Sequence, residues 1–268
     1  MRAAITPIDD PADPRIAPYI AVRERDLVGR RGEFIAEGEV VLRVLLGADA
    51  RCRASSLLVA ENRLARLTPM LEGPGDAPPV YVASQAVMDA VVGFHIHRGM
   101  LAHGVRPADP GVDALLGALP PRALVVALFG IANHDNVGGI FRNAAAFGAD
   151  AVLLDPACCD PLYRKAIRVS VGATLTVPFA RLAVSEDILA ILSRHAFAPL
   201  AFTPAGLEPL AGLKRPHRAA ILLGAEGPGL PAPLLAAART LAIPMAPGWD
   251  SLNVAAASAI VLHHLATH

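Results

Sequence analysis

The second half of the chain alternates short, fully apolar runs with longer segments in which apolar residues recur at helical spacing. The apolar runs are predicted strands, at Ala123–Phe129, Ala151–Leu154, Thr174–Phe179, Pro199–Phe202, Ala219–Leu223 and Leu241–Pro244. Helices are predicted over about Val137–Phe147, from a Ser185 cap to His195, and over Asn253–His264. This alternation predicts an α/β domain with a mostly parallel sheet, whose ligands would bind beyond the carboxyl ends of the strands.

The first half has a mixed pattern. Residues 1–14 are rich in Pro and Asp and predict a loose arm. Short strands are predicted at Ser56–Ala60 and Val80–Ala83, and a helix over Ser84–Val92 with Ser84 as its cap. Four prolines in Val105–Arg122 mark a boundary. We therefore expect an arm (1–14), an N-terminal domain (15–105), a linker (106–122) and a C-terminal domain (123–268).

Composition narrows the class of protein. Hydrophobic residues make up 54% and charged residues 18%, which is enough apolar material for a buried core. Lys+Arg and Asp+Glu are 24 each, so a polyanionic partner would have to bind a local basic patch. No apolar run is long enough for a membrane helix, the N-terminus lacks a secretory pattern, and three cysteines form no metal knuckle. A cytoplasmic protein without a metal is expected.

Three segments carry polar residues at the ends of predicted strands. The first, IANHDNVGGIFRNAAAFGAD, places Asn136 in a turn and Arg142 in an otherwise apolar helix, where an arginine needs a phosphate or a carboxylate as partner. The second, ILLGAEGPGL, is a strand running into a glycine-rich loop with Glu226 as its one charge, which could pair with Arg142 or bind a ligand. In the third, LAIPMAPGWDSLNVAAASA, Ser251 can cap the last helix and Asn253 can present its amide to a neighbouring loop.

Taken in order, these segments resemble the three signature motifs of the SpoU (TrmH) family of RNA ribose 2′-O-methyltransferases. YRKAIRVSVGATLTVPF (Tyr163–Phe179) is similar to the family's K-x-x-R-x-S-x-G segment. FIAEGEVVLRVLL and HRGMLAHG look like its RNA-substrate-binding domain, an α/β unit similar to certain ribosomal proteins. The resemblance covers the chain from about Arg15. It implies the fold of the SPOUT superfamily, with a trefoil knot in the C-terminal domain, and a homodimer.

The resemblance also implies S-adenosylmethionine as cofactor and RNA as substrate, with no metal. Arg142 matches the family's essential arginine, whose implied role is to bind the target phosphate and to help remove the 2′-hydroxyl proton. Because an arginine rarely gives up its proton, stabilisation of the developing alkoxide is the favoured alternative to a role as base. The other polar positions of the motifs are matched by Asn136, Glu226, Ser251 and Asn253. The cofactor would be held by Thr203, Gly224, Ala225, Gly227, Ile243, Met245 and Leu252. Contacts to RNA phosphates are expected from Arg23, Arg30, Arg31, Arg98 and Arg168.

Rival interpretations make different demands on the sequence. A nicotinamide or nucleotide enzyme would need the G-x-G-x-x-G fingerprint, whereas the loop here reads G-x-x-G-x-G. A non-catalytic RNA-binding member of the fold would be favoured by loss of Arg142, Asn253 or the glycine loop, and all three are present. Between the two RNA classes, the N-terminal domain favours ribosomal RNA over transfer RNA. Trp249 stands where a smaller aliphatic residue is expected, and its indole could stack on a base or shield the loop.

Overall fold

The computed structural model describes residues 4–20, 32–72, 77–93 and 95–267. Its contacts divide the chain into two compact units. The first comprises Met1–Pro107 and Asp160–Thr176, and the second comprises Ala108–Cys159 and Val177–His268. The segment Asp160–Thr176, which the sequence pattern assigned to the C-terminal domain, therefore packs with the N-terminal part of the chain.

The first unit is built on a mixed five-stranded sheet with the order β1-β4-β3-β5-β2. Its strands are β1 (Ile5–Ile8), β2 (Glu33–Glu37), β3 (Arg53–Ala60), β4 (Val80–Ala83) and β5 (Met100–Val105). β1, β4 and β3 run parallel, and β5 is antiparallel to both β3 and β2. The expectation of a loose arm over residues 1–14 was wrong, because Ile5–Ile8 pairs with β4 and Ile8 is fully buried.

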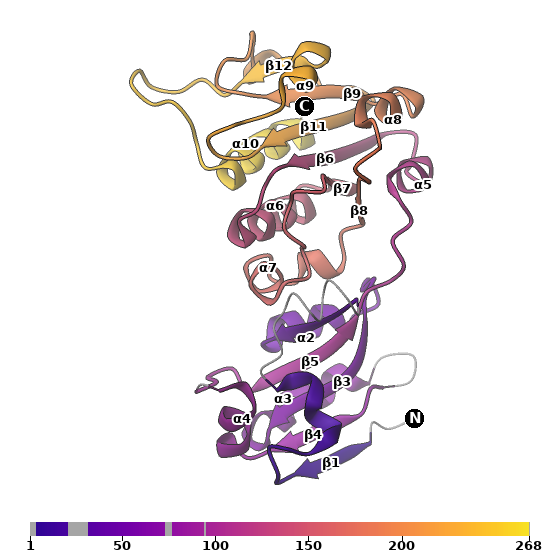
Figure 1. The fold of residues 1–268 in the computed structure, drawn as a ribbon, viewed down its shortest axis with the longest axis vertical. Helices are drawn as coiled ribbons and strands as arrows, with labels where there is room; N and C mark the ends of the chain where they lie inside the picture. Colours follow the sequence, from indigo (N-terminus) through magenta and orange to yellow (C-terminus); the bar gives the residue numbers. More distant parts are fainter. Residues whose placement is uncertain (1–3, 21–31, 73–76, 94, 268) are drawn as a thin grey trace. The chain divides into compact units, whose positions relative to one another are not determined.

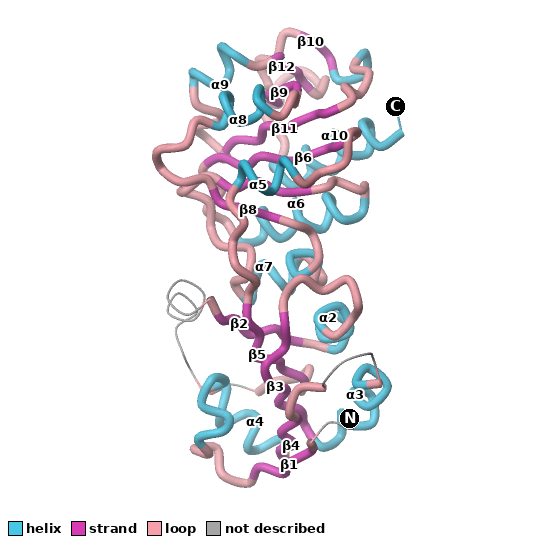
Figure 2. The backbone as a smooth tube through the Cα atoms, turned by 90° about the vertical axis from the view of Figure 1, so that its right-hand side faces the viewer, coloured by secondary structure: helices cyan, strands magenta, loops and turns pink. Residues whose placement is uncertain are grey.

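Short helices flank this sheet. They are η1 (Pro14–Tyr19), α2 (Glu39–Leu45), η3 (Glu61–Arg63), α3 (Leu64–Leu67), η4 (Thr68–Leu71), α4 (Gln85–Val92), α7 (Arg164–Val169) and η5 (Ala173–Leu175). α4 lies on one side of the sheet, and α2 and α3 lie on the other (Figure 2). The predicted cap of α4 is confirmed, since the Ser84 hydroxyl accepts a hydrogen bond from the Val87 amide at 3.3 Å.

The second unit contains a seven-stranded sheet in which every pairing is parallel, in the order β10-β12-β9-β11-β6-β7-β8 (Figure 1). The strands are β6 (Ala123–Phe129), β7 (Ala151–Leu154), β8 (Phe179–Arg181), β9 (Ala198–Phe202), β10 (Glu208–Pro209), β11 (Arg218–Gly224) and β12 (Arg239–Ala242). All seven residues of β6 are buried, as expected of a strand covered on both faces. The α/β fold with a large parallel sheet is thus confirmed.

One predicted strand is misplaced. The apolar run Thr174–Phe179 begins as the 3-10 turn η5, which follows Gly172 in the left-handed conformation at φ +88°. Pro178 has no N–H to donate to a ladder, and the strand begins only at Phe179. The run therefore contributes one residue to β8.

Helices cover both faces of the larger sheet. They are α5 (Val112–Gly117), α6 (His134–Ala146), α8 (Ile188–Arg194), η6 (Leu210–Gly212), α9 (Ala232–Ala237) and α10 (Val254–Thr267). α5, α8 and α9 cover one face, and α6 and α10 cover the other (Figure 2). No helix in the described ranges is both long and apolar enough to cross a membrane.

Two local expectations need correction. The predicted linker 106–122 contains α5, whose Val112 and Leu116 are fully buried in the core of the second unit. α8 is capped by Asp187, not by Ser185, because the Asp187 carboxylate accepts from the Leu189 amide at 2.9 Å and from the Ala190 amide at 3.3 Å. In the first case nearby prolines hid a helix, and in the second a neighbouring polar residue was taken for the helix cap.

α6 and α10 pack closely against each other, which matters for the site because each carries motif residues. A Cβ added to Gly139 would lie 2.8 Å from the Ala255 Cβ, so only glycine fits there without a shift. The Asn143 amide donates to the Ala255 carbonyl and to the Ser258 hydroxyl, both at 2.8 Å. These contacts hold the two helices in fixed register.

Candidate active site

A pocket of about 410 Å³ opens at the carboxyl ends of β9, β11 and β12. Apolar side chains from these strands, from the loop after β11 and from α10 form much of its lining, including Leu223, Leu230, Leu241, Val254 and Ala257. Two carboxylates also line it, Glu226 and Asp250, but no lysine or arginine does among the described residues. The volume lies in the usual range for small-molecule sites, and the position is where parallel sheets bind ligands.

Glycines let the backbone segments around this pocket approach each other. A Cβ on Gly224, the last residue of β11, would lie 2.3 Å from the Gly229 carbonyl carbon and 2.5 Å from the Leu230 nitrogen. A Cβ on Gly206 would lie 2.2 Å from the Leu241 carbonyl carbon. Gly229 itself has φ +69°, a conformation that favours glycine. The loop after β11 is thus folded back onto the strand end. A side chain at Gly224 or Gly206 would overlap the neighbouring backbone and prevent this close approach.

Glu226 is held by two amides from different motifs. The Glu226 carboxylate accepts from Asn253 Nδ2 at 2.8 Å and from Asn136 Nδ2 at 3.1 Å. Asn253 Nδ2 also donates to Asn136 Oδ1 at 2.8 Å. Asn136 is buried, so its amide needs these partners. The three segments that the sequence singled out therefore meet in one hydrogen-bonded cluster beside the pocket.

Asn253 also begins α10. Its Oδ1 accepts from the Ala255 amide at 3.0 Å and from the Ala256 amide at 3.2 Å, so Asn253 and not Ser251 caps the last helix. Because the oxygen is used by the helix, the amide nitrogen is the group that faces Glu226 and Asn136. The expectation that Asn253 presents its amide to a neighbouring loop is confirmed. Ser251 is exposed and lines the pocket.

Arg142 lies on α6, six residues after Asn136, and is exposed rather than buried in an apolar helix. Among the residues that the structure describes, no carboxylate forms an ion pair with it, and Glu226 binds the two asparagines instead. The expectation that a buried Arg142 needs a partner was therefore wrong, because the side chain is exposed. Its guanidinium is left available for an anion that comes from outside the chain.

A loop after β7 braces the chain segment that leads into α6. The Asp155 carboxylate accepts from the Gly130 amide at 3.0 Å, and the Cys159 amide donates to the Ile131 carbonyl at 3.0 Å. The Cys158 thiol donates to the Leu128 carbonyl at 3.3 Å and accepts from the Ile131 amide at 3.4 Å. Burial, and then the nearby Asp155, raise the pKa of the Cys158 thiol to about 12.

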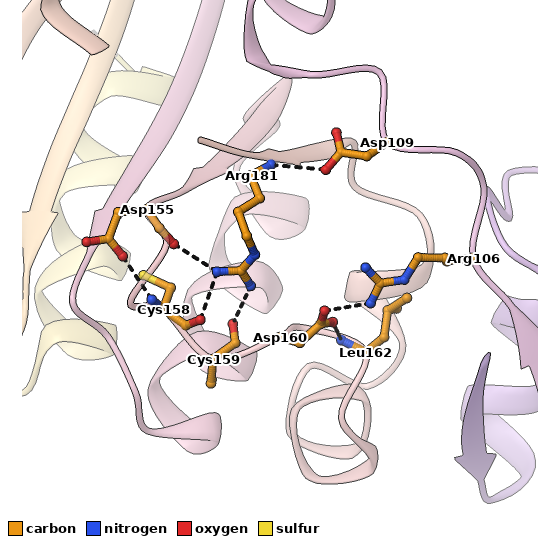
Figure 3. Close-up of polar contacts among 8 residues, drawn as sticks. All are labelled: Arg106, Asp109, Asp155, Cys158, Cys159, Asp160, Leu162 and Arg181. Atoms are coloured by element: carbon orange, nitrogen blue, oxygen red, sulfur yellow. Dashed lines mark hydrogen bonds and ion pairs between the residues drawn. The ribbon is translucent and has the colours of Figure 1, made fainter. Parts of the chain in front are cut away.

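Arg181, at the end of β8, holds that loop in turn (Figure 3). Its guanidinium donates to the carbonyls of Asp155 at 2.8 Å, Cys158 at 2.9 Å and Cys159 at 3.4 Å. Its backbone amide donates to the Asp109 carboxylate at 3.3 Å. One side chain thus satisfies three carbonyls of an irregular loop, which would otherwise have no regular partner. Arg181 was not predicted from the sequence, because it lies outside the segments that match the family motifs.

All seven residues predicted to hold a cofactor line the pocket, namely Thr203, Gly224, Ala225, Gly227, Ile243, Met245 and Leu252. Of the five predicted catalytic residues, Glu226 and Ser251 line it, Asn136 and Asn253 bind Glu226, and Arg142 does neither. Of the predicted RNA contacts, Arg98 and Arg168 lie in the first unit, whereas Arg23, Arg30 and Arg31 lie outside the described residues. In the described ranges, no group of three or more His, Cys, Asp or Glu side chains is placed to hold a metal ion.

The family model of the SpoU rRNA methylase family matches residues 123–263. An uncharacterized tRNA/rRNA methyltransferase of Mycobacterium tuberculosis is 40% identical over 264 residues, which cover 95% of this chain and 89% of that protein. The chain belongs to the SpoU rRNA methylase family. It is thereby placed among the family's RNA methyltransferases, as the three motifs predicted.

Solved structures share the family's fold along nearly the whole chain. An RNA 2′-O ribose methyltransferase is 26% identical, with a TM-score of 0.76 and 97% of each chain covered. An AdoMet-bound rRNA methyltransferase from Sinorhizobium meliloti has a TM-score of 0.77 at 23% identity, with 97% of each chain covered, which is a likeness of fold. The likeness to these structures therefore extends over both units.

Proposed function

We propose that the protein transfers a methyl group from S-adenosylmethionine to a ribose 2′-hydroxyl of structured RNA, with ribosomal RNA favoured over transfer RNA. The observation that carries this proposal is the junction of a pocket at the strand ends with the Asn136–Glu226–Asn253 cluster, in a chain of the SpoU family. The position of methylation is supported by the solved 2′-O ribose methyltransferase of similar fold. The preference for ribosomal RNA rests on the resemblance of the N-terminal domain to ribosomal proteins.

The pocket suits S-adenosylmethionine in size and in charge. Apolar walls can take the adenine, and Glu226 and Asp250 favour a ligand that carries a positive sulfonium. When bound, the cofactor supplies an electrophilic methyl group. Thr203, Gly224, Ile243 and Leu252 would hold it, and the Sinorhizobium meliloti enzyme of this fold was solved with AdoMet bound.

Arg142 would bind the phosphate next to the target ribose. Its exposed guanidinium carries five N–H donors and no acceptor, so its chemical contribution is electrostatic. It would stabilise the negative charge that develops on the 2′-oxygen as the hydroxyl proton passes to solvent and the oxygen takes the methyl group, whose bond to the sulfonium sulfur would break. Asn136, Glu226, Ser251 and Asn253 would fix the loops and the ribose, because in-line transfer depends on orientation.

The assembly implied by the family is a homodimer, with the first unit as the RNA-binding part and a knot in the second. Exposed apolar side chains on α10 and on the loop before it support a subunit contact there, since Ile260 is 42% exposed and Trp249 is 75% exposed. Light scattering on the purified protein would give the mass of a dimer, and a monomer mass would overturn this part of the proposal.

Incubation with radiolabelled S-adenosylmethionine and unmodified ribosomal or transfer RNA tests the function. We expect alkali-resistant label in ribosomal RNA, and losses of about 100-fold or more for Arg142→Ala, because removing an electrostatic stabiliser of this kind costs that much in rate. Arg194→Ala, an exposed arginine on α8 paired with Asp113, is the matched control and should keep full activity. Label in transfer RNA alone would reassign the substrate. Cofactor binding without transfer to either RNA would mean that the substrate is another RNA or a partially assembled particle. Neither transfer nor cofactor binding would favour a non-catalytic member of the fold.

A further inference from the structure

The pocket at the carboxyl ends of β9, β11 and β12 has two carboxylates, Glu226 and Asp250, and no basic side chain among its described lining residues. The only other polar side chains among those residues are the hydroxyls of Thr203 and Ser251. S-adenosylmethionine carries two positive groups, the sulfonium and the α-ammonium, and one negative group, the α-carboxylate. The charges of the pocket therefore attract the positive groups of the cofactor and offer no cation to its carboxylate.

The two carboxylates differ in the partners that they already have. Asn136 and Asn253 both donate to one oxygen of Glu226, Oε1, at 3.1 Å and 2.8 Å. Within the described part of the chain, Asp250 accepts no hydrogen bond and forms no ion pair. Both oxygens of the Asp250 carboxylate are therefore free to accept hydrogen bonds from a ligand.

Asp250 is held at the pocket by the loop that joins β12 to α10 (Figure 1). The loop turns at Gly248, whose φ of +89° favours glycine, and the Trp249 amide donates to the Ala246 carbonyl at 3.4 Å. The next three residues, Asp250–Leu252, all line the pocket, and Asn253 then caps α10. Asp250 is exposed as well as lining the pocket, so its carboxylate lies at the open side.

The two positive groups of the cofactor make different demands on a carboxylate. A sulfonium has no hydrogen atom on its sulfur, so a carboxylate attracts it by charge alone, whereas an ammonium group has three N–H donors. Hydrogen bonds between ionised partners are roughly twice as strong as those between neutral ones. The ammonium also stands at the end of a flexible chain, which suits a carboxylate at the open side of the pocket. A carboxylate with two free oxygens therefore matches the ammonium better than the sulfonium.

We propose that Asp250 binds the α-ammonium group of S-adenosylmethionine and so selects ligands that carry an amino-acid end. This inference rests on the proposed function, which takes S-adenosylmethionine as the occupant of the pocket. Glu226 contacts Asn136 of α6, the helix that also carries Arg142, and so belongs to the side at which the ribose would bind. Adenine nucleotides share the adenine of the cofactor but carry phosphates, which both carboxylates repel. Asp250 thus contributes to the choice of cofactor and not to methyl transfer itself.

Calorimetry with three ligands that differ in their positive groups tests this assignment. S-adenosylmethionine carries both groups, S-adenosylhomocysteine carries the ammonium without the sulfonium, and 5′-methylthioadenosine carries neither. Asp250→Asn should weaken binding of the first two by the same factor, about three- to tenfold, since the pair that it removes is charged but exposed. Binding of 5′-methylthioadenosine should not change. The loss should shrink at about 1 M salt, where the screening length is roughly 3 Å.

Asp49→Asn is the matched control, because Asp49 is also exposed but lies in the first unit and does not line the pocket. The control should keep all three wild-type affinities, and both variants should keep the wild-type melting temperature. Asp250→Asn should also raise KM for S-adenosylmethionine and leave kcat unchanged, as expected for a group that binds the cofactor equally throughout the reaction.

Three results would overturn the proposal. Weaker binding of S-adenosylmethionine alone would assign Asp250 to the sulfonium, and equal weakening of all three ligands would give it a role in the shape of the pocket only. Unchanged affinities in Asp250→Asn would show that the carboxylate binds no part of the cofactor, and the proposed function would stand. A wild-type protein that binds none of the three ligands would refute the proposed function and this inference with it.

Discussion

Two pockets of this protein have nearly the same volume, about 410 Å³ in the second unit and about 390 Å³ in the first, but opposite charge. We call the one in the first unit, which is lined by Arg63, Arg98 and Arg168, the basic pocket. Among described residues, the pocket of the second unit is lined by two carboxylates and no arginine, and the basic pocket by three arginines and one carboxylate that is already paired. Size therefore says little about their ligands. The charge of the pocket in the second unit suits a cationic ligand, and that of the basic pocket suits an anion.

The pockets also differ in how glycine is used. In the second unit, Gly224 lets one backbone segment fold onto another, and the wall of the pocket is the result. In the first unit, Gly38 and Gly99 make room for the stems of Arg98 and Arg63. The first arrangement shapes a cavity and the second places charges. Substitutions should consequently disturb cofactor binding and RNA binding independently of each other.

Gly224→Ala is expected to show the largest difference between the two pockets, because it should weaken cofactor binding and leave RNA binding unchanged. The added Cβ would lie 2.3 Å from backbone that cannot move aside as a flexible side chain would. Overpacking of this kind costs up to about 3 kcal/mol, which corresponds to roughly a 100-fold loss of affinity for S-adenosylmethionine by calorimetry. RNA affinity should be unchanged. Gly212→Ala, where a Cβ meets no atom within 4 Å, is the control. Unaltered cofactor affinity in Gly224→Ala would mean that the cofactor binds elsewhere.

A second prediction concerns the Asn136–Glu226–Asn253 cluster beside the pocket of the second unit. Asn136→Ala and Asn253→Ala each remove an amide that donates to Glu226. Each should lower the free energy of unfolding by about 1–3 kcal/mol, and each should slow methyl transfer. Because the two amides also bind each other, the double variant should cost about 0.5–3 kcal/mol less than the sum. Simple additivity in the stability measurements would show that the three side chains do not act as one unit.

Arg181 offers a test of the support behind the cluster. Arg181→Met removes three hydrogen bonds to carbonyls and should destabilise the protein by about 2 kcal/mol, since bonds from charged donors are the stronger ones. It should also expose the Cys158 thiol, which is now 6% exposed with a pKa of about 12. In protein that carries Cys159→Ser, alkylation of Cys158 should be slow up to about pH 9. It should become fast when Arg181→Met is added. Equal alkylation rates would contradict the bracing role.

The raised pKa of Cys158 has a stability consequence with a definite sign. The folded-state pKa, about 12, lies above the unfolded value, so the contribution to stability is complete below the unfolded pKa and is lost as the pH rises toward 12. Denaturant unfolding should therefore show a stability that falls faster above about pH 9 than in Cys158→Ala. The same pH dependence in both proteins would assign the loss to other groups.

The smallest effect is expected for Glu39→Gln. Removing the one negative charge in the basic pocket should raise RNA affinity about two- to fivefold at low salt, since single exposed charges contribute about 0.5–1 kcal/mol. Filter binding across a salt series checks this, and the gain should disappear as salt rises. Cofactor affinity should not change. A loss of RNA affinity would indicate that Glu39 orients the neighbouring arginines.

Much of this architecture could be predicted from the sequence, for a physical reason. β6, β7, β9 and β11 lie in apolar runs that are buried on both faces, and such runs are visible without a structure. Ligands were predicted to bind beyond the carboxyl ends of the parallel strands, and Asn253 was predicted to present its amide to a neighbouring loop. The glycine loop and the amide of Asn253 fulfilled that expectation.

The remaining features depend on contacts that no local pattern records. Ser251 and Asn253 are both good caps, and the choice between them depends on where Glu226 and Asn136 lie. Ile5–Ile8 looked like part of a loose arm because its partner strand begins at Val80. Arg181 satisfies carbonyls more than twenty residues away. Arg168 belongs to a motif of the C-terminal half but packs with the first unit.

The most direct test of the central claim is the chemical identity of the product. After reaction with S-adenosylmethionine, the RNA is digested to nucleosides and analysed by mass spectrometry, beside RNA treated with Arg142→Ala. We predict a single 2′-O-methylated nucleoside that is absent with the variant. A nucleoside methylated on its base, or equal 2′-O-methylation by Arg142→Ala, would contradict it.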